Sequence, residues 1–180
     1  MQNDLEKILF HEQTILSRLD ELAREITAEY RDKELTVILV LNGSIMFAAD
    51  LLRRIPLRLK LDCISVSSYH GGTESTGNVT FDQISMPDID DRHILIIDDI
   101  LDSGRTLFAI REKLLAEGKP KSTKICVLLR KMKERAQPAE ADFVGFDIGD
   151  EFVVGYGLDY EERYRNLPLI GVFRTDLIGK

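Results

Sequence analysis

The chain has 180 residues, of which 44% are hydrophobic and 31% charged, and these values predict one globular domain with its own core. Its net charge of −7 argues against a nucleic-acid-binding surface, and no apolar run approaches the length of a membrane span. Cys63 and Cys126 each lie in an apolar run, so we expect buried thiols, no disulfide framework and a cytoplasmic location.

The amino-terminal segment predicts a short strand followed by a long helix. Residues 7–10 carry the apolar run of the strand. Apolar residues then recur at intervals of four, three and four, which is typical of an amphipathic helix from about Glu12 to Tyr30. We expect this helix to pack against the core without contributing chemistry.

The next segment predicts a buried strand, a small-residue loop and a second helix. Residues 37–41 are all apolar, and Asn42, Gly43 and Ser44 separate them from a helical pattern that begins at Ile45. The free N–H groups of a helix start favour a bound anion. A plain turn in which Ser44 caps the helix explains the same residues, so the pattern alone leaves both interpretations open.

Residues 59–69 alternate between apolar and polar like a half-buried strand, and Val79 and Phe81 indicate a returning strand. The intervening residues 70–78 are dominated by glycine and hydroxyl side chains. This composition predicts either a loose hairpin or a lid that closes over a reacting centre.

The most informative segment runs from residue 93 to residue 107. Residues 94–97 predict a strand buried on both faces, as in the middle of a parallel sheet, and the apolar run stops at Asp98 and Asp99. A helical pattern starts after Thr106, so residues 102–106 form a loop at the carboxyl end of a strand. Ligands of open α/β sheets bind at such loops.

The side chains of this loop suit a phosphorylated sugar. Ser103, Gly104 and Thr106, with the helix dipole behind them, favour a phosphate monoester. Carboxylates repel a phosphate, so the two preceding aspartates suit the vicinal hydroxyls of a ribose or a cation, and Asp102 can accept a proton. A phosphoacceptor pocket like that of receiver domains, or a simple Ser-Gly turn, are the alternatives.

Residues 124–129 complete a strand-helix-strand crossover, and the charged run 130–135 reads as a solvated face. Residues 142–160 contain short strands that are broken by glycines and rich in aromatics. They do not continue the α/β rhythm, so we expect them to form a small cap at the ligand end of the sheet.

Residues 96–107 resemble the phosphoribosyl-pyrophosphate (PRPP) signature of type I phosphoribosyltransferases. Together with residues 40–43, 67–69 and 142–168, they make the chain similar to the 6-oxopurine members of that family along nearly its whole length. The resemblance implies an α/β fold whose mostly parallel central sheet is flanked by helices and carries a small hood. It implies a single domain over 1–180, with a core of about 31–130 and a hood from about 1–10 and 131–180.

The same resemblance implies purine salvage. The expected reaction is Mg²⁺-dependent transfer of the 5-phosphoribosyl group from PRPP to hypoxanthine, with guanine as a second substrate, giving IMP or GMP and pyrophosphate. A cytoplasmic homodimer or homotetramer is implied, without nucleic-acid or membrane partners. A non-catalytic sensor of PRPP or nucleotides, and a sibling enzyme that uses xanthine or a pyrimidine, remain the alternatives.

By position in the family motifs, the resemblance also implies site residues. The catalytic base, for the N7 proton of the purine, is Asp102. The residues for the 5-phosphate and ribose are Asp98, Asp99, Asp102, Ser103, Gly104, Arg105 and Thr106. The pyrophosphate residues are Leu41, Asn42, Gly43 and Arg165. The purine residues are Lys131, Phe152 and Val153, and the lid residues are Ser68 and Tyr69. The metal residues are Asp98, Asp99 and Asp159.

One position departs from the family pattern. Asn42 stands where the family often has a basic side chain, so the resemblance leaves the backbone N–H groups of Asn42 and Gly43 as the expected pyrophosphate donors. The family's non-proline cis peptide bond is expected between Leu41 and Asn42.

Overall fold

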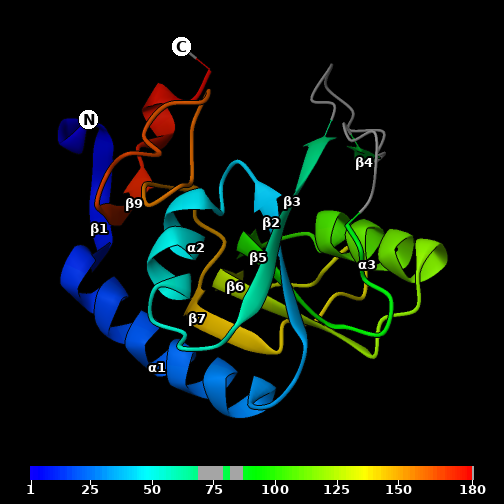
Figure 1. Cartoon of the computed structure of the whole chain (residues 1–180). Coiled ribbons are helices and arrows are strands. Elements are labelled where there is room, and N and C mark those ends of the chain that lie inside the picture. The colour runs from blue at the N-terminus through cyan, green and yellow to red at the C-terminus, as the bar shows by residue number, and fades with distance from the viewer. Residues whose placement is uncertain (69–78, 82–86, 180) are drawn as a thin grey trace.

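The structure is a computed structural model that describes residues 1–68, 79–81 and 87–179. A six-stranded sheet with the order β4-β3-β2-β5-β6-β7 forms its centre (Figure 1). The strands are β2 (Leu35–Leu41), β3 (Leu59–Ser68), β4 (Val79–Phe81), β5 (His93–Leu101), β6 (Ser122–Lys131) and β7 (Phe143–Ile148). Only the pairing of β3 with the short edge strand β4 is antiparallel among the described pairs of this sheet.

Helices cover both faces of the sheet. Helices α1 (Glu12–Tyr30) and α2 (Ile45–Leu52) share one hydrophobic cluster with Leu95 and Ile97 of β5. Helix α3 (Arg105–Glu117) packs on the opposite face, in the cluster that contains Ile94 and Ile96. Successive side chains of a strand point to opposite faces, so the apolar run of β5 supplies both clusters and is buried as predicted.

A second, three-stranded sheet forms the hood above the central sheet (Figure 1). Its order is β1-β9-β8, with antiparallel pairing throughout. The strands are β1 (Leu5–His11), β9 (Leu169–Phe173) and β8 (Val153–Val154). The short 3-10 helices η1 (Gln2–Asp4) and η2 (Thr175–Leu177) lie at the two ends of the chain, so the hood joins the first and last segments.

Most sequence predictions of elements are confirmed. Helix α1 has the predicted bounds, and β1 contains the predicted strand at residues 7–10. No helix in the described part of the chain combines the length and hydropathy of a membrane span. The predicted lid begins at Ser68, the last residue of β3, and its remainder, including Tyr69, lies outside the described residues.

Strand β5 runs through Asp98 and Asp99 to Leu101 beside β6, so the loop predicted from residue 102 starts directly after the strand. One prediction needs correction. Residues 143–148 do not belong to the hood, because they form β7, which pairs in parallel with β6 at the edge of the central sheet. The connection 132–142 reaches β7 without a helix, and this is why the α/β rhythm of the sequence is lost there.

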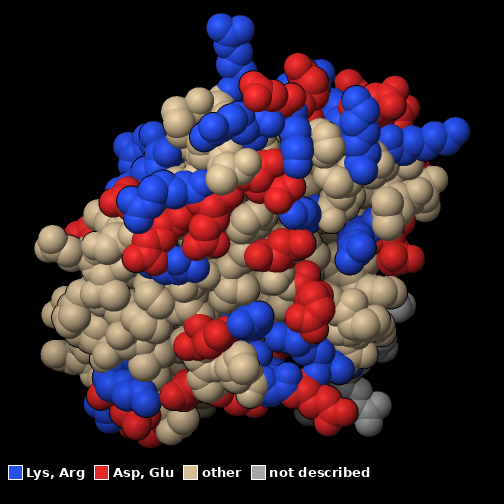
Figure 2. All heavy atoms as spheres, turned by 90° about the horizontal axis from the view of Figure 1, so that it is seen from below, with Lys and Arg blue, Asp and Glu red and all other residues tan. Residues whose placement is uncertain are grey.

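Figure 2 shows the face of the molecule that lies below the view of Figure 1, where α1 runs along the bottom. Lys and Arg lie among Asp and Glu on this face. Some of these opposite charges form ion pairs. In α1, Arg18 contacts Glu21 and Glu25, and Lys33, just after the helix, contacts Glu29.

Candidate active site

A cavity of about 380 Å³ opens at the carboxyl ends of the parallel strands, beneath the hood. Its walls come from loop 41–44 after β2, from residues 98–107 at the junction of β5 and α3, and from Asp159 and Arg165 of the hood. The structure therefore brings together residues predicted for phosphate, ribose, pyrophosphate and metal. Asn42, Arg105 and the purine residues Lys131, Phe152 and Val153 are not part of its wall.

Loop 102–106 is shaped by a left-handed glycine and by support from behind. Gly104 has a φ of 78° and precedes the first turn of α3, and a Cβ at this position would lie 2.7 Å from the carbonyl oxygen of Gln137. The N–H groups of Ala136 and Gln137 donate to the carbonyl oxygen of Ser103 over 3.1 and 3.2 Å. The loop is thus held in place, with the positive end of the α3 dipole directed into the cavity, where an anion is favoured.

Asp98 and Asp99 are two adjacent acids, of which Asp98 is buried and Asp99 is partly exposed. Asp98 is 6% exposed, and its carboxylate accepts the N–H of Asp99 over 2.9 Å. Burial, together with the charge of Asp99, raises the pKa of Asp98 well above its ordinary value. Burial also raises the pKa of Asp99, although its hydrogen bond with Asp98 and the nearby Arg165 act against this rise. Hydroxyl donors or a cation at this pair would relieve the cost of burying its charge.

Loop 41–44 lies directly against these acids. A Cβ on Gly43 would overlap the carboxylate of Asp99, so a larger residue here would displace that carboxylate. The peptide bond between Leu41 and Asn42 is cis, as the resemblance implies. Ser44 does not cap α2 with its side chain, because its buried hydroxyl donates to the carbonyl oxygen of Val40 over 2.6 Å.

Asp159 and Arg165 approach the cavity from the hood as an ion pair. Nη2 of Arg165 lies 2.9 Å from Oδ1 of Asp159, and Nη1 donates to the carbonyl oxygen of Gly157 over 2.8 Å. The other carboxylate oxygen of Asp159 accepts the N–H of Glu162. Within the described ranges, no group of three or more His, Cys, Asp or Glu side chains is arranged to hold a metal by itself. The predicted carboxylates therefore fit Mg²⁺ only if substrate oxygens or waters complete its coordination.

A network of four charges stands beside the cavity. The ammonium of Lys131 lies 3.1 Å from Asp102 and 3.2 Å from Asp150, and that of Lys133 lies 2.6 Å and 2.7 Å from the same two carboxylates. Partial burial alone would raise the pKa of Asp102, but the hydrogen bonds from Lys133 and Lys131 outweigh it and lower the pKa. Asp102 is therefore held as a carboxylate.

The sequence prediction named Lys131 and Asp102 but missed Lys133 and Asp150. The charged run was expected to be a solvated face, whereas the Lys131 side chain is only 9% exposed. Lys131 ends β6 and Lys133 follows two residues later. In an extended chain this spacing would place the two side chains on the same side. That periodicity is the signal that could have paired them.

Phe152 and Val153 lie in the hood, where an aromatic cluster supports them. The Phe152 ring is 41% exposed and meets Tyr160 and Phe173 edge to face, with centroids 5.9 and 6.2 Å apart. Val153 is buried in β8 and pairs with Val172 of β9. An exposed ring held at its edges by other rings can stack on a planar ligand. Tyr160 and Phe173 were missed because their role depends on tertiary contacts.

Comparisons with known proteins agree with this geometry. A family model described as a phosphoribosyl transferase domain matches residues 7–161. A hypoxanthine-guanine phosphoribosyltransferase of Staphylococcus epidermidis is 46% identical over 180 residues, which cover 100% of both chains. A crystal structure of a hypoxanthine phosphoribosyltransferase from Staphylococcus aureus matches with a TM-score of 0.93 and 45% identity, covering 100% of this chain and 97% of that one. A Trypanosoma cruzi hypoxanthine phosphoribosyltransferase mutant, in a ternary substrates complex, matches with a TM-score of 0.87 and 38% identity, covering 97% and 98%.

Proposed function

The chain belongs to the phosphoribosyltransferase family, and from this premise we propose that it transfers the 5-phosphoribosyl group of PRPP to hypoxanthine and to guanine. The reaction is Mg²⁺-dependent, yields IMP or GMP and pyrophosphate, and serves purine salvage. One observation carries the proposal. A pair of adjacent acids, of which Asp98 is buried, a helix amino terminus and an arginine line a single cavity, and these are the groups that a ribose diol, its 5-phosphate and a pyrophosphate need.

The reaction breaks the bond between the anomeric carbon of ribose and a pyrophosphate oxygen and joins that carbon to a ring nitrogen of the purine, so positive charge develops on the sugar as the pyrophosphate leaves. Ser103, Gly104, Arg105 and Thr106 hold the 5-phosphate, and Asp98 and Asp99 accept hydrogen bonds from the ribose hydroxyls. Arg165 and the N–H groups of Asn42 and Gly43 bind the pyrophosphate as it leaves. Mg²⁺, held near Asp98, Asp99 and Asp159 with substrate oxygens, supplies further positive charge when bound.

The purine is bound by residues next to the cavity. Asp102 takes the N7 proton, Lys131 donates to the 6-oxo group, Phe152 stacks on the ring and the backbone of Val153 meets its edge. In the structure described here Lys131 is paired with Asp102 and Asp150. An ammonium has three N–H donors, so Lys131 can donate to the incoming 6-oxo group while it remains paired with both carboxylates.

A coupled assay for pyrophosphate release tests the proposal. Purified protein with PRPP and Mg²⁺ is expected to release pyrophosphate with hypoxanthine and with guanine, and to release less with xanthine. A protein that binds PRPP but releases no pyrophosphate with any purine would instead be a sensor. Turnover confined to xanthine or a pyrimidine would make it a sibling enzyme.

We also propose a cytoplasmic homodimer or homotetramer and a single domain with a core and a hood, on the strength of the family resemblance. Light scattering coupled to gel filtration of the full chain measures the assembly directly. A monomer at assay concentration would contradict this part of the proposal.

A further inference from the structure

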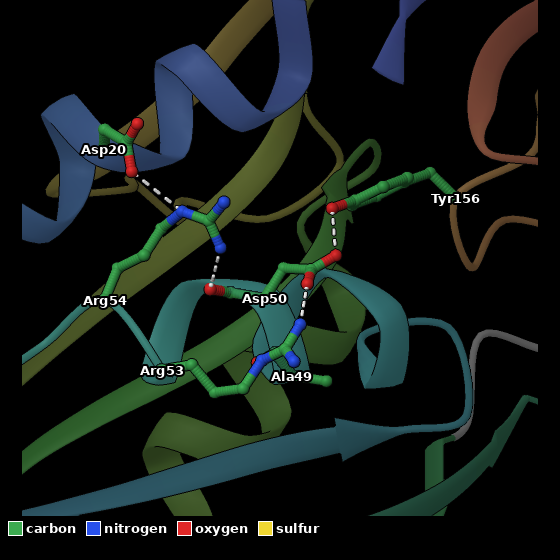
Figure 3. Close-up of polar contacts among 6 residues, drawn as sticks. All are labelled: Asp20, Ala49, Asp50, Arg53, Arg54 and Tyr156. Atoms are coloured by element: carbon green, nitrogen blue, oxygen red, sulfur yellow. Dashed lines mark hydrogen bonds and ion pairs between the residues drawn. The ribbon is translucent and has the colours of Figure 1, made fainter. Parts of the chain in front are cut away.

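A tyrosine of the hood reaches across to the core. Tyr156 is 4% exposed, and its hydroxyl donates to Oδ2 of Asp50 in α2 over 2.5 Å (Figure 3). Its φ is 52°, a left-handed conformation that is costly for a bulky residue, and its neighbours Gly155 and Gly157 also have positive φ. The backbone of this turn therefore adopts an unfavourable conformation in which the phenol is directed at α2.

Asp50 is well anchored in the core (Figure 3). Its other carboxylate oxygen pairs with Arg53, and its carbonyl oxygen accepts from Arg54 over 2.7 Å. Arg54 in turn donates to Asp20 of α1 over 2.8 Å. The hydroxyl of Tyr156 is thus tied, through Asp50 and Arg54, to two helices that cover the central sheet.

The same hood turn touches both halves of the proposed pyrophosphate site. Gly157 packs so closely on loop 41–44 that a Cβ there would overlap the carbonyl oxygen of Gly43. On its other side, Gly157 exchanges two hydrogen bonds with Arg165, over 2.8 and 2.9 Å. Loop 41–44 leads directly into α2, so Asp50 lies on the helix whose start forms this loop.

We propose that Tyr156 is a positioning residue, whose hydrogen bond to Asp50 fixes the separation between Arg165 of the hood and loop 41–44 of the core. The role of Tyr156 is to set the affinity for the pyrophosphate part of PRPP. This inference rests on the proposed function of the site. Tyr156 acts through Gly157 and Asp50 and does not itself line the cavity.

Tyr156→Phe removes the hydroxyl and little else. We expect the KM for PRPP to rise about tenfold, since a hydrogen bond to a charged group is lost, while the KM for hypoxanthine changes by less than about twofold. Tyr164→Phe is the matched control. Tyr164 also has a positive φ and donates to a carboxylate, Asp4, but that bond stays within the hood. The Tyr164→Phe variant is expected to leave the KM for PRPP unchanged.

Hydrogen exchange of the free protein provides a readout that does not need turnover. In Tyr156→Phe, the amides of residues 43–48 are expected to exchange about threefold faster or more, with no such change in Tyr164→Phe. Asp50→Asn keeps a neutral acceptor for Tyr156 and is expected to change the exchange rates and the KM for PRPP less than Tyr156→Phe does.

Three results would overturn the proposal. The first is unchanged amide exchange at residues 43–48 in Tyr156→Phe. The second is an equal rise of the KM values for PRPP and hypoxanthine in that variant. The third is an equally large rise of the KM for PRPP in the Tyr164→Phe control. If the wild-type protein turns over no purine, the proposed function fails, and the exchange experiment still decides whether Tyr156 holds the loop.

Discussion

At the scale of the residue, two lysines rather than one stabilise the ionised carboxylate of Asp102. Lys133 lies 2.6 Å from Asp102 and Lys131 lies 3.1 Å from it, and both contacts favour the ionised acid. Lys131 has a second task in the proposed reaction, because it also donates to the purine. Lys133 is therefore the lysine of this pair whose effect on Asp102 can be tested without removing a donor to the purine.

Lys133→Met is expected to shift the pH dependence of the reaction. The pKa of Asp102 lies below its ordinary value, and loss of the Lys133 hydrogen bond allows it to rise. A base must be unprotonated to act, so as pH falls the variant should lose activity at a higher pH than the wild type. The acid limb of kcat/KM for hypoxanthine is therefore expected to move to higher pH than in the wild type.

The control for this shift is Lys119→Met, since Lys119 is exposed and lies outside the site. Lys133→Arg keeps the charge and should restore most of the wild-type profile. Carboxyl NMR titration of Asp102 measures its pKa without turnover. An acid limb and an Asp102 titration that both stay at their wild-type positions in Lys133→Met would show that Lys133 does not tune this acid.

At the scale of the element, the site is divided between two sheets. The central sheet contributes the acids and loop 102–106, whereas the hood contributes Arg165 and Phe152. Phe152 immediately precedes β8. Its side chain has no polar atom, so what it contributes to the site is its aromatic ring. This division predicts that changes in the ring of Phe152 affect the purine and spare PRPP.

Phe152→Ala tests this division. Base–aromatic stacking contributes about 1–3 kcal/mol, so the KM for hypoxanthine is expected to rise about tenfold or more. The KM for PRPP should stay within about twofold, because the cavity wall is unchanged. Phe152→Tyr keeps a stacking ring and serves as the matched variant. Steady-state kinetics with each substrate varied in turn would contradict the assignment if both KM values rose together.

The elements that could be predicted from the sequence are those with local signals. The period of α1, the apolar run of β5 and the Ser-Gly turn before α3 each lie within a short stretch. Strand β7 could not be placed, because its parallel pairing with β6 depends on a connection without a helix. The hydrogen bond between Tyr156 and Asp50 joins residues 106 positions apart, and no local pattern encodes it.

At the scale of the whole molecule, the acids of the cavity lower the stability of the substrate-free fold and serve the binding of substrate. Asp98 is buried next to the charge of Asp99, and burial together with that charge raises the pKa of Asp98. The native state is penalised for holding them ionised near neutral pH. PRPP with Mg²⁺ should remove this penalty and also bridge the central sheet to the hood, so binding and stability are coupled.

A thermal unfolding experiment with Asp98→Asn examines this coupling. The variant removes one buried charge, so its substrate-free Tm is expected to exceed that of the wild type by about 2–4 °C, which corresponds to about 1 kcal/mol in a chain of this size. At saturating PRPP and Mg²⁺, about 100 times Kd, the wild type should gain about 2.7 kcal/mol and the variant much less. Leu115→Ala, at an exposed position on α3, is the control and should show the full ligand shift. A variant with a lower substrate-free Tm and an undiminished ligand shift would show that Asp98 stabilises the fold and does not hold the ribose.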